Sequence, residues 1–170
     1  MRRSVRLSIL VAAALLMVAA TRPAEAQELG HRPATHGTGL GLGGTVFLGG
    51  LSGLSAAYDG GPWHAEGLVG VSKIGSGIKA SISLGGRFWY HLHSGPNSDF
   101  SVGGGLGFGH EGPADADILD LELGAQLRAF IASNVAISGT LGFAIQMVDR
   151  HAYVLTGQPV VGLGIHYFFY

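Results

Sequence analysis

Apolar side chains alternate with glycine or polar ones through most of the chain after residue 39. The clearest case is residues 119–131, where every odd position holds leucine, alanine or isoleucine and most even positions are polar. Successive side chains of a β-strand point to opposite faces, whereas a helix would scatter these leucines around its surface. The alternation therefore predicts an all-β chain with eight strands, at 39–48, 54–59, 63–72, 80–92, 99–109, 119–131, 135–147 and 160–170.

Turn-forming residues separate the predicted strands. Asp59-Gly60-Gly61-Pro62, residues 93–98 and Ser133-Asn134 predict short turns, and we expect loops at 110–117 and 149–157. Eight short strands in sequence fit three architectures: a sandwich, a soluble ligand-binding barrel, or an antiparallel up-and-down barrel that spans a membrane.

The first 26 residues have the features of a secretory signal peptide. Arg2, Arg3 and Arg6 precede an apolar run over 7–20, and Ala24-Glu25-Ala26 fits the small-x-small cleavage pattern. The apolar run is shorter than the roughly 18–20 residues that a spanning helix needs. We therefore predict export with cleavage after Ala26, a short periplasmic lead-in at 27–38 and a barrel domain at 39–170.

The composition of the predicted mature chain excludes several classes of protein. It has six Lys and Arg against ten Asp and Glu, so it lacks the basic patch of a nucleic-acid-binding domain. It contains no cysteine, so it cannot be a disulfide-stabilised secreted scaffold. Glycine is abundant, with 30 of 170 residues, more than twice the usual ~7 %.

The positions of the charged residues distinguish the three architectures. Every charged residue inside a predicted strand falls on the glycine-rich face, and none falls on the apolar face. A solvated face has no need for so many glycines, whereas a narrow eight-stranded barrel needs them to make room for interlocking side chains. The pattern thus favours a membrane barrel with its apolar face outward and a charge network in the lumen formed by Glu66, Arg87, Asp120, Glu122, Arg128 and His166.

Aromatic residues on the apolar face gather at one end of the predicted barrel. Amphipathic rings are favoured at the boundary between lipid and water. The sequence therefore predicts an aromatic girdle made of Tyr58, Trp63, Tyr90, Phe100, Tyr167 and Phe169.

The chain from Gly39 to Tyr170 resembles the small eight-stranded outer-membrane barrels of the OmpA/OmpX type. The resemblance includes the last strand, where Leu163, Ile165, Tyr167 and Phe169 alternate as in the family's carboxy-terminal assembly signal, although Tyr170 is one residue extra. The resemblance implies the outer membrane of a Gram-negative bacterium after Sec export, contact with outer-membrane lipid and lipopolysaccharide, and insertion by the barrel-assembly machinery.

We predict a monomer with a structural or envelope role, a lumen plugged by ion pairs, and no cofactor, metal site or catalytic residues. One alternative is a small gated pore, opened by rearrangement of those pairs. Another is a lipid-modifying enzyme, since His93, Ser94 and Asp99 loosely resemble the residues of outer-membrane lipid A deacylases, without their spacing. The last is a soluble exported binding barrel of the lipocalin kind.

Overall fold

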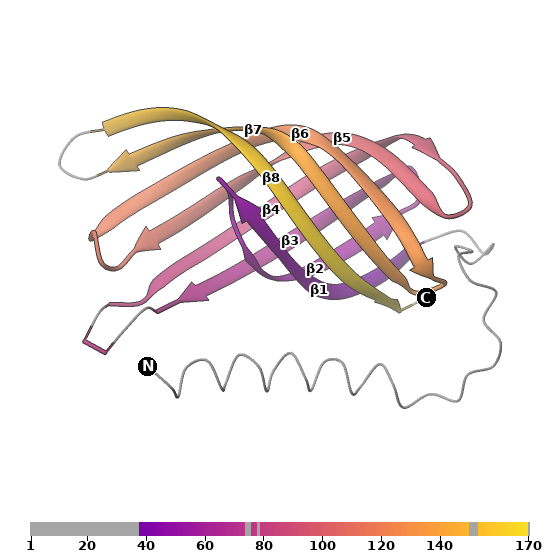
Figure 1. Cartoon of the computed structure of the whole chain (residues 1–170), viewed down its shortest axis with the longest axis horizontal. Coiled ribbons are helices and arrows are strands. Elements are labelled where there is room, and N and C mark those ends of the chain that lie inside the picture. The colour runs from indigo at the N-terminus through magenta and orange to yellow at the C-terminus, as the bar shows by residue number, and fades with distance from the viewer. Residues whose placement is uncertain (1–37, 74–75, 78, 150–152, 170) are drawn as a thin grey trace.

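Eight antiparallel strands close into a single barrel, in which each strand pairs with its sequence neighbours and the first pairs with the last (Figure 1). The computed structural model describes residues 38–73, 76–77, 79–149 and 153–169. The predicted signal peptide at 1–26 lies outside these ranges, as does the predicted lead-in at 27–38 except for its last residue, Thr38, which begins the first strand. The closed, all-β, up-and-down barrel predicted from the alternation is confirmed. In the described part of the chain there is no helix with the length and apolarity needed to cross a membrane.

The strands differ in length by more than a factor of two. They are β1 (Thr38–Leu48), β2 (Gly53–Gly60), β3 (Trp63–Ser72), β4 (Ser81–Ser94), β5 (Ser98–Glu111), β6 (Ala116–Ala132), β7 (Val135–Asp149) and β8 (Tyr153–Phe169). We call the end of the barrel with the β2–β3, β4–β5 and β6–β7 connections the turn end, and the opposite end the loop end.

The β1–β2 hairpin stops well short of its neighbours at the loop end (Figure 1). β1 ends at Leu48, which lies opposite Val161 of β8, whereas β8 begins at Tyr153. Among the described residues, 153–160 of β8 therefore pair with β7 and have no partner on β1. The wall of the barrel is lower on this side.

Several predicted loops are shorter than expected because the strands extend into them. The connection expected at 149–157 spans only the three residues between Asp149 and Tyr153, and the one expected at 110–117 spans 112–115. β4 also continues through His93 to Ser94. Sequence alternation fades in these segments, but the neighbouring strand still offers hydrogen-bond partners, which keep the backbone extended.

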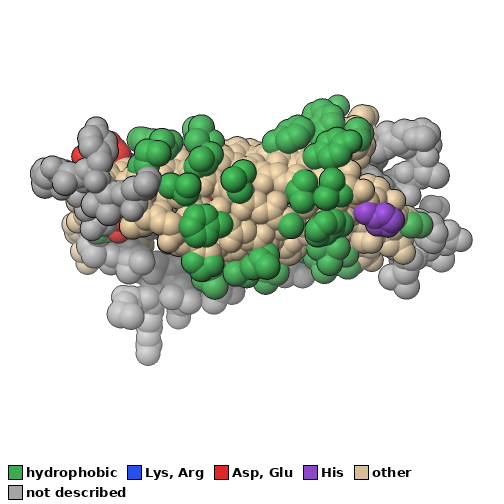
Figure 2. Space-filling model, turned by 90° about the horizontal axis from the view of Figure 1, so that it is seen from above, with side chains coloured by type: hydrophobic (Ala, Val, Ile, Leu, Met, Phe, Trp, Pro, Cys, Tyr) green, Lys and Arg blue, Asp and Glu red, His purple; other side chains and the backbone are tan. Residues whose placement is uncertain are grey.

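The apolar face of the sheet points outward. Thirty large hydrophobic residues of the described part of the chain are exposed, and they come from all eight strands. In Figure 2 hydrophobic side chains lie along the length of the wall, and acidic side chains are visible only near one end. The buried set is the reverse of an ordinary core, since it contains two arginines, five carboxylates and three histidines.

Glycines of the inner face make room for large side chains from neighbouring strands. A Cβ at Gly105 of β5 would come within 2.7 Å of Arg87 Cγ, and one at Gly41 of β1 would come within 2.9 Å of the Phe168 ring. Such contacts are closer than real Cβ atoms tolerate. Glycine at these positions therefore allows bulky side chains to fill a narrow barrel.

Candidate functional site

The six residues predicted to form the lumen charge network all lie inside the barrel. Each is less than 10 % exposed. Direct contacts place five of them in two clusters, each around one arginine, and Asp120 belongs to neither. We call these the Arg128 cluster (Asp59, His64, His91, Asp99 and Arg128) and the Arg87 cluster (Ser55, Glu66, Arg87, Glu122 and His166).

The Arg128 cluster lies at the turn end, and its charged side chains all come from strands. Arg128 Nη2 donates to Asp99 Oδ2 at 2.6 Å and to Asp59 Oδ2 at 2.7 Å, and Nε donates to Asp99 Oδ2 at 3.1 Å. The side chains of both aspartates are fully buried. One guanidinium thus holds two carboxylates from β2 and β5, which ties opposite sides of the barrel together.

Histidines and aromatic rings complete the Arg128 cluster. His91 Nε2 lies 2.7 Å from His64 Nδ1 and 3.5 Å from Arg128 Nη2. The Arg128 guanidinium also lies 5.0 Å from the Phe130 ring and 5.6 Å from the Phe168 ring. Contacts of this kind favour a cation over the face of a ring.

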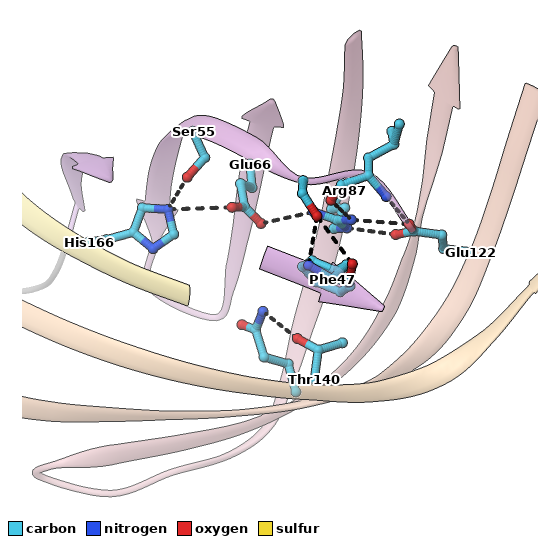
Figure 3. Close-up of polar contacts among 10 residues, drawn as sticks. Phe47, Ser55, Glu66, Arg87, Glu122, Thr140 and His166 are labelled. Atoms are coloured by element: carbon cyan, nitrogen blue, oxygen red, sulfur yellow. Dashed lines mark hydrogen bonds and ion pairs between the residues drawn. The ribbon is translucent and has the colours of Figure 1, made fainter. Parts of the chain in front are cut away.

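The Arg87 cluster crosses the middle of the lumen as a chain of polar contacts (Figure 3). Arg87 Nε donates to Glu122 Oε2 at 2.6 Å and Nη2 donates to Oε1 at 3.0 Å, a bidentate pair. On its other side Arg87 Nη1 is 3.9 Å from Glu66 Oε2. Glu66 Oε1 lies 3.4 Å from His166 Nε2, which is 2.7 Å from Ser55 Oγ.

The turn that joins β1 to β2 folds against the Arg87 cluster. Arg87 Nη2 donates to the Leu51 carbonyl at 3.0 Å, and the Leu51 N–H lies 3.4 Å from Glu122 Oε1. The Leu51 side chain occupies the space that a Cβ at Gly85 or Gly107 would take. This turn therefore contributes both an apolar group and backbone hydrogen bonds to the closure of the lumen.

The buried carboxylates outnumber the buried guanidiniums. Among the described residues there are five of the former and two of the latter. Asp120, the fifth carboxylate, is only 3 % exposed, and its Oδ1 atom has no hydrogen-bond partner there. Each guanidinium is therefore shared, since an unpaired buried charge is costly.

Sequence reasoning did not select Asp59, His64, His91, Asp99 or Ser55 for the network. The first four complete the Arg128 cluster, and Ser55 binds His166. The sequence did contain a signal for their inward direction. Each lies an even number of residues from an inward glycine, alanine or charged residue of its own strand, and such residues share a face. Asp59 was predicted as both the last residue of the second strand and the first of the turn that follows, whereas β2 continues to Gly60.

Of the residues considered for catalysis, Ser94 and Asp99 are register partners at the ends of β4 and β5, but their side chains lie in different environments. His93 and Ser94 are exposed at the end of β4, whereas Asp99 is buried against Arg128. Ser55, His166 and Glu66 are close to one another, but both Ser55 and Glu66 contact the same ring nitrogen, Nε2. A catalytic triad uses the two ring nitrogens for different partners, so this arrangement does not relay a proton from serine to carboxylate.

Within the ranges that the structure describes, no group of three or more His, Cys, Asp or Glu side chains is arranged to hold a metal ion.

The six residues of the predicted girdle lie on the outer face near the turn end. Four of them are exposed, and Trp63 and Tyr167 are partly buried by neighbouring rings. The ring centroid of Trp63 lies 5.7 Å from that of Tyr58 and 5.5 Å from that of Phe88. The ring centroids of Tyr167 and Phe169 are 5.1 Å apart. Aromatic residues therefore form contacts across neighbouring strands at this end.

Comparison with known proteins found no matching family model and no matching curated protein. One solved structure that matches is described as "Solution NMR structure of de novo designed TMB2.3". It is 13 % identical in sequence, and the match covers 81 % of this chain and 98 % of that one with a TM-score of 0.40.

Proposed function

We propose that this protein is an outer-membrane β-barrel with a structural role in the cell envelope, whose lumen is sealed by two ion-pair clusters. One observation carries the proposal: the barrel is apolar outside and charged inside. Every strand contributes exposed large hydrophobic side chains, mostly leucine, valine, isoleucine and phenylalanine. The charged strand residues Glu66, Arg87, Asp120, Glu122 and Arg128 are enclosed. A barrel dissolved in water would gain from the opposite arrangement, whereas a lipid bilayer favours this one.

Closure of the lumen is supported by how the clusters are packed. Arg87, Arg128, Glu66, Asp59 and Asp99 have side chains that are at most 3 % exposed. An ion moving through the barrel would have to separate pairs held at 2.6–2.7 Å. The proposal assigns these residues to sealing and stability, and it assigns no catalytic role.

Cell fractionation tests the location. The protein should remain with the outer membrane until detergent extracts it, and it should migrate differently on gels before and after heating, because closed barrels resist unfolding by detergent. Recovery in the soluble periplasmic fraction would contradict the proposal and favour the lipocalin-like alternative. Lipid hydrolysis or deacylation by the purified protein would contradict the non-catalytic role.

A small gated pore is the second candidate, and the β1–β2 turn favours it. The loop-end half of the lumen is filled partly by Leu51, which belongs to a turn and not to a strand. A turn can move without breaking the strand pairing of the barrel. Recordings in planar bilayers separate the two functions, since a sealed barrel gives no channel events in the wild type and a gated pore gives discrete openings.

A further inference from the structure

A small cavity lies in the lumen between the two clusters. It has a volume of about 10 Å³, about the least that admits one water molecule. Its lining includes Glu66 and His166 of the Arg87 cluster and His64 and Arg128 of the Arg128 cluster. Gln126 also lines it. The cavity is thus the place where the two clusters approach each other.

Three of the lining residues carry a buried polar atom with no hydrogen-bond partner among the described residues. These atoms are Arg128 Nη1, Glu66 Oε1 and Gln126 Oε1. The residues are 2–4 % exposed. A buried polar group without a partner is costly, and such groups in proteins usually bind ordered water.

The chemistry of the three atoms matches one water molecule. Arg128 Nη1 is a donor, and the oxygens of Glu66 and Gln126 are acceptors. A water can accept one hydrogen bond from Arg128 while donating to the other two. A metal cation fits less well, because hard cations take oxygen ligands on all sides and the cationic Arg128 lines this cavity.

We propose that this cavity is a binding site for one structural water, which joins the Arg87 and Arg128 clusters into a single hydrogen-bonded network. The guanidinium of one cluster is then linked through the water to Glu66 of the other. The two halves of the lumen stabilise each other through this link, although no ion pair within 4.0 Å joins Arg128 to Glu66 among the described residues.

A high-resolution crystal structure of the detergent-solubilised barrel tests the site directly. The expected result is an electron-density peak within hydrogen-bond distance of Arg128 Nη1, Glu66 Oε1 and Gln126 Oε1. A site without such a peak, with Gln126 turned to bond His64 directly, would overturn the proposal. So would a peak surrounded only by oxygen ligands at metal distances.

Two variants provide a matched comparison. Gln126→Leu removes the acceptor that faces the cavity, and Thr140→Val removes the hydroxyl that Gln126 Nε2 bonds at 3.2 Å. We expect the water to be lost or displaced in Gln126→Leu and retained in Thr140→Val. Retention in both variants with unchanged occupancy would show that Gln126 does not hold it.

A thermodynamic cycle tests the coupling. If the water links the clusters, the destabilisation by Glu66→Gln should be smaller in an Arg128→Met background than in the wild type, whereas unlinked clusters give additive effects. The result of this cycle does not depend on whether the lumen is sealed. Absence of the water leaves the proposed function intact, and channel activity in its presence would contradict the sealed lumen alone.

Discussion

The Arg128 and Arg87 clusters use the same chemistry at two levels of the lumen, but different parts of the chain hold them. In the Arg128 cluster both carboxylates come from strands, and their side chains are fully buried. In the Arg87 cluster Glu122 is 8 % exposed, and the guanidinium also binds the backbone of the β1–β2 turn.

This difference separates a rigid seal from an adjustable one. Strand residues in a closed barrel cannot move far without breaking the ladder of backbone hydrogen bonds, whereas a turn can. The turn end of the lumen is therefore the stable part, and any opening should begin at the loop end, beside Leu51.

The largest effect is expected from Arg128→Met, which leaves Asp59 and Asp99 buried without their shared partner. We expect a loss of about 3–5 kcal/mol in the free energy of unfolding, measured by urea titration of the refolded barrel. The triple variant with Asp59→Asn and Asp99→Asn should recover part of it, because the unpaired charges are gone. A loss below about 1 kcal/mol would contradict the conclusion that the Arg128 cluster forms the more stable part of the lumen.

Arg87→Met should cost somewhat less, about 3 kcal/mol, because one carboxylate, Glu122, loses its main partner and is slightly exposed. It also frees the Leu51 carbonyl. We therefore expect faster proteolysis within the β1–β2 turn in this variant than in Arg128→Met, measured by limited digestion of folded protein. Equal protection of the turn in both variants would contradict its dependence on Arg87.

Two glycine substitutions compare the inner and outer faces. Gly107→Ala places a methyl group where Leu51 lies, so we expect a loss of about 1–3 kcal/mol. Gly67→Ala places one on the outer face, where the nearest atom, Ala56 O, is 4.0 Å away. There we expect a gain of about 0.5–1 kcal/mol. The temperature at which half of the protein shifts on a gel measures the stability of both variants. A loss of stability in Gly67→Ala would show that the outer face also needs a glycine at this position.

Leu51→Ala removes the apolar group that the turn contributes to the lumen. Leu51 is partly exposed, so we expect a loss of about 1 kcal/mol in chemical unfolding. Bilayer recordings of this variant sharpen the functional comparison. A sealed lumen predicts no events, since both ion-pair clusters remain, whereas frequent openings would favour the gated pore.

The smallest effect is expected from Lys79→Ala. Lys79 Nζ lies 2.6 Å from Asp115 Oδ1 at the loop end, but both side chains are about 70 % exposed. Solvent and salt screen such pairs, so the loss in unfolding free energy should be below about 0.5 kcal/mol. A cost similar to that of Arg87→Met would mean that burial does not set the strength of these pairs.

Much of the fold could be predicted because a period of two is a local property. Alternation over 119–131 identifies a strand, its two faces and the side that carries Glu122 and Arg128 without knowledge of its neighbours. The positions where strands end were harder to predict. Residues 153–157 were expected to form a loop, yet they pair with β7, because the backbone groups of a partner strand can hold a neighbouring segment extended.

The candidate site was predicted in part for the same reason. The alternation of side chains along each strand assigns Glu66, Arg87 and Arg128 to the inner face. It does not determine which charged side chains contact each other. The pairing of Arg128 with Asp59 and Asp99 joins residues 69 and 29 positions apart, from strands that the closed barrel brings together. Strand register and barrel closure decide such contacts.

The sequence by itself determined that one face would be apolar and the other glycine-rich and charged, because side-chain direction follows from position in a strand. Only the tertiary structure decided how the lumen is closed. The division into two clusters, the placement of Leu51 between Gly85 and Gly107, and the small cavity beside Gln126 depend on distances across the barrel. Those distances are set when β1 pairs with β8, and no local pattern along the chain encodes them.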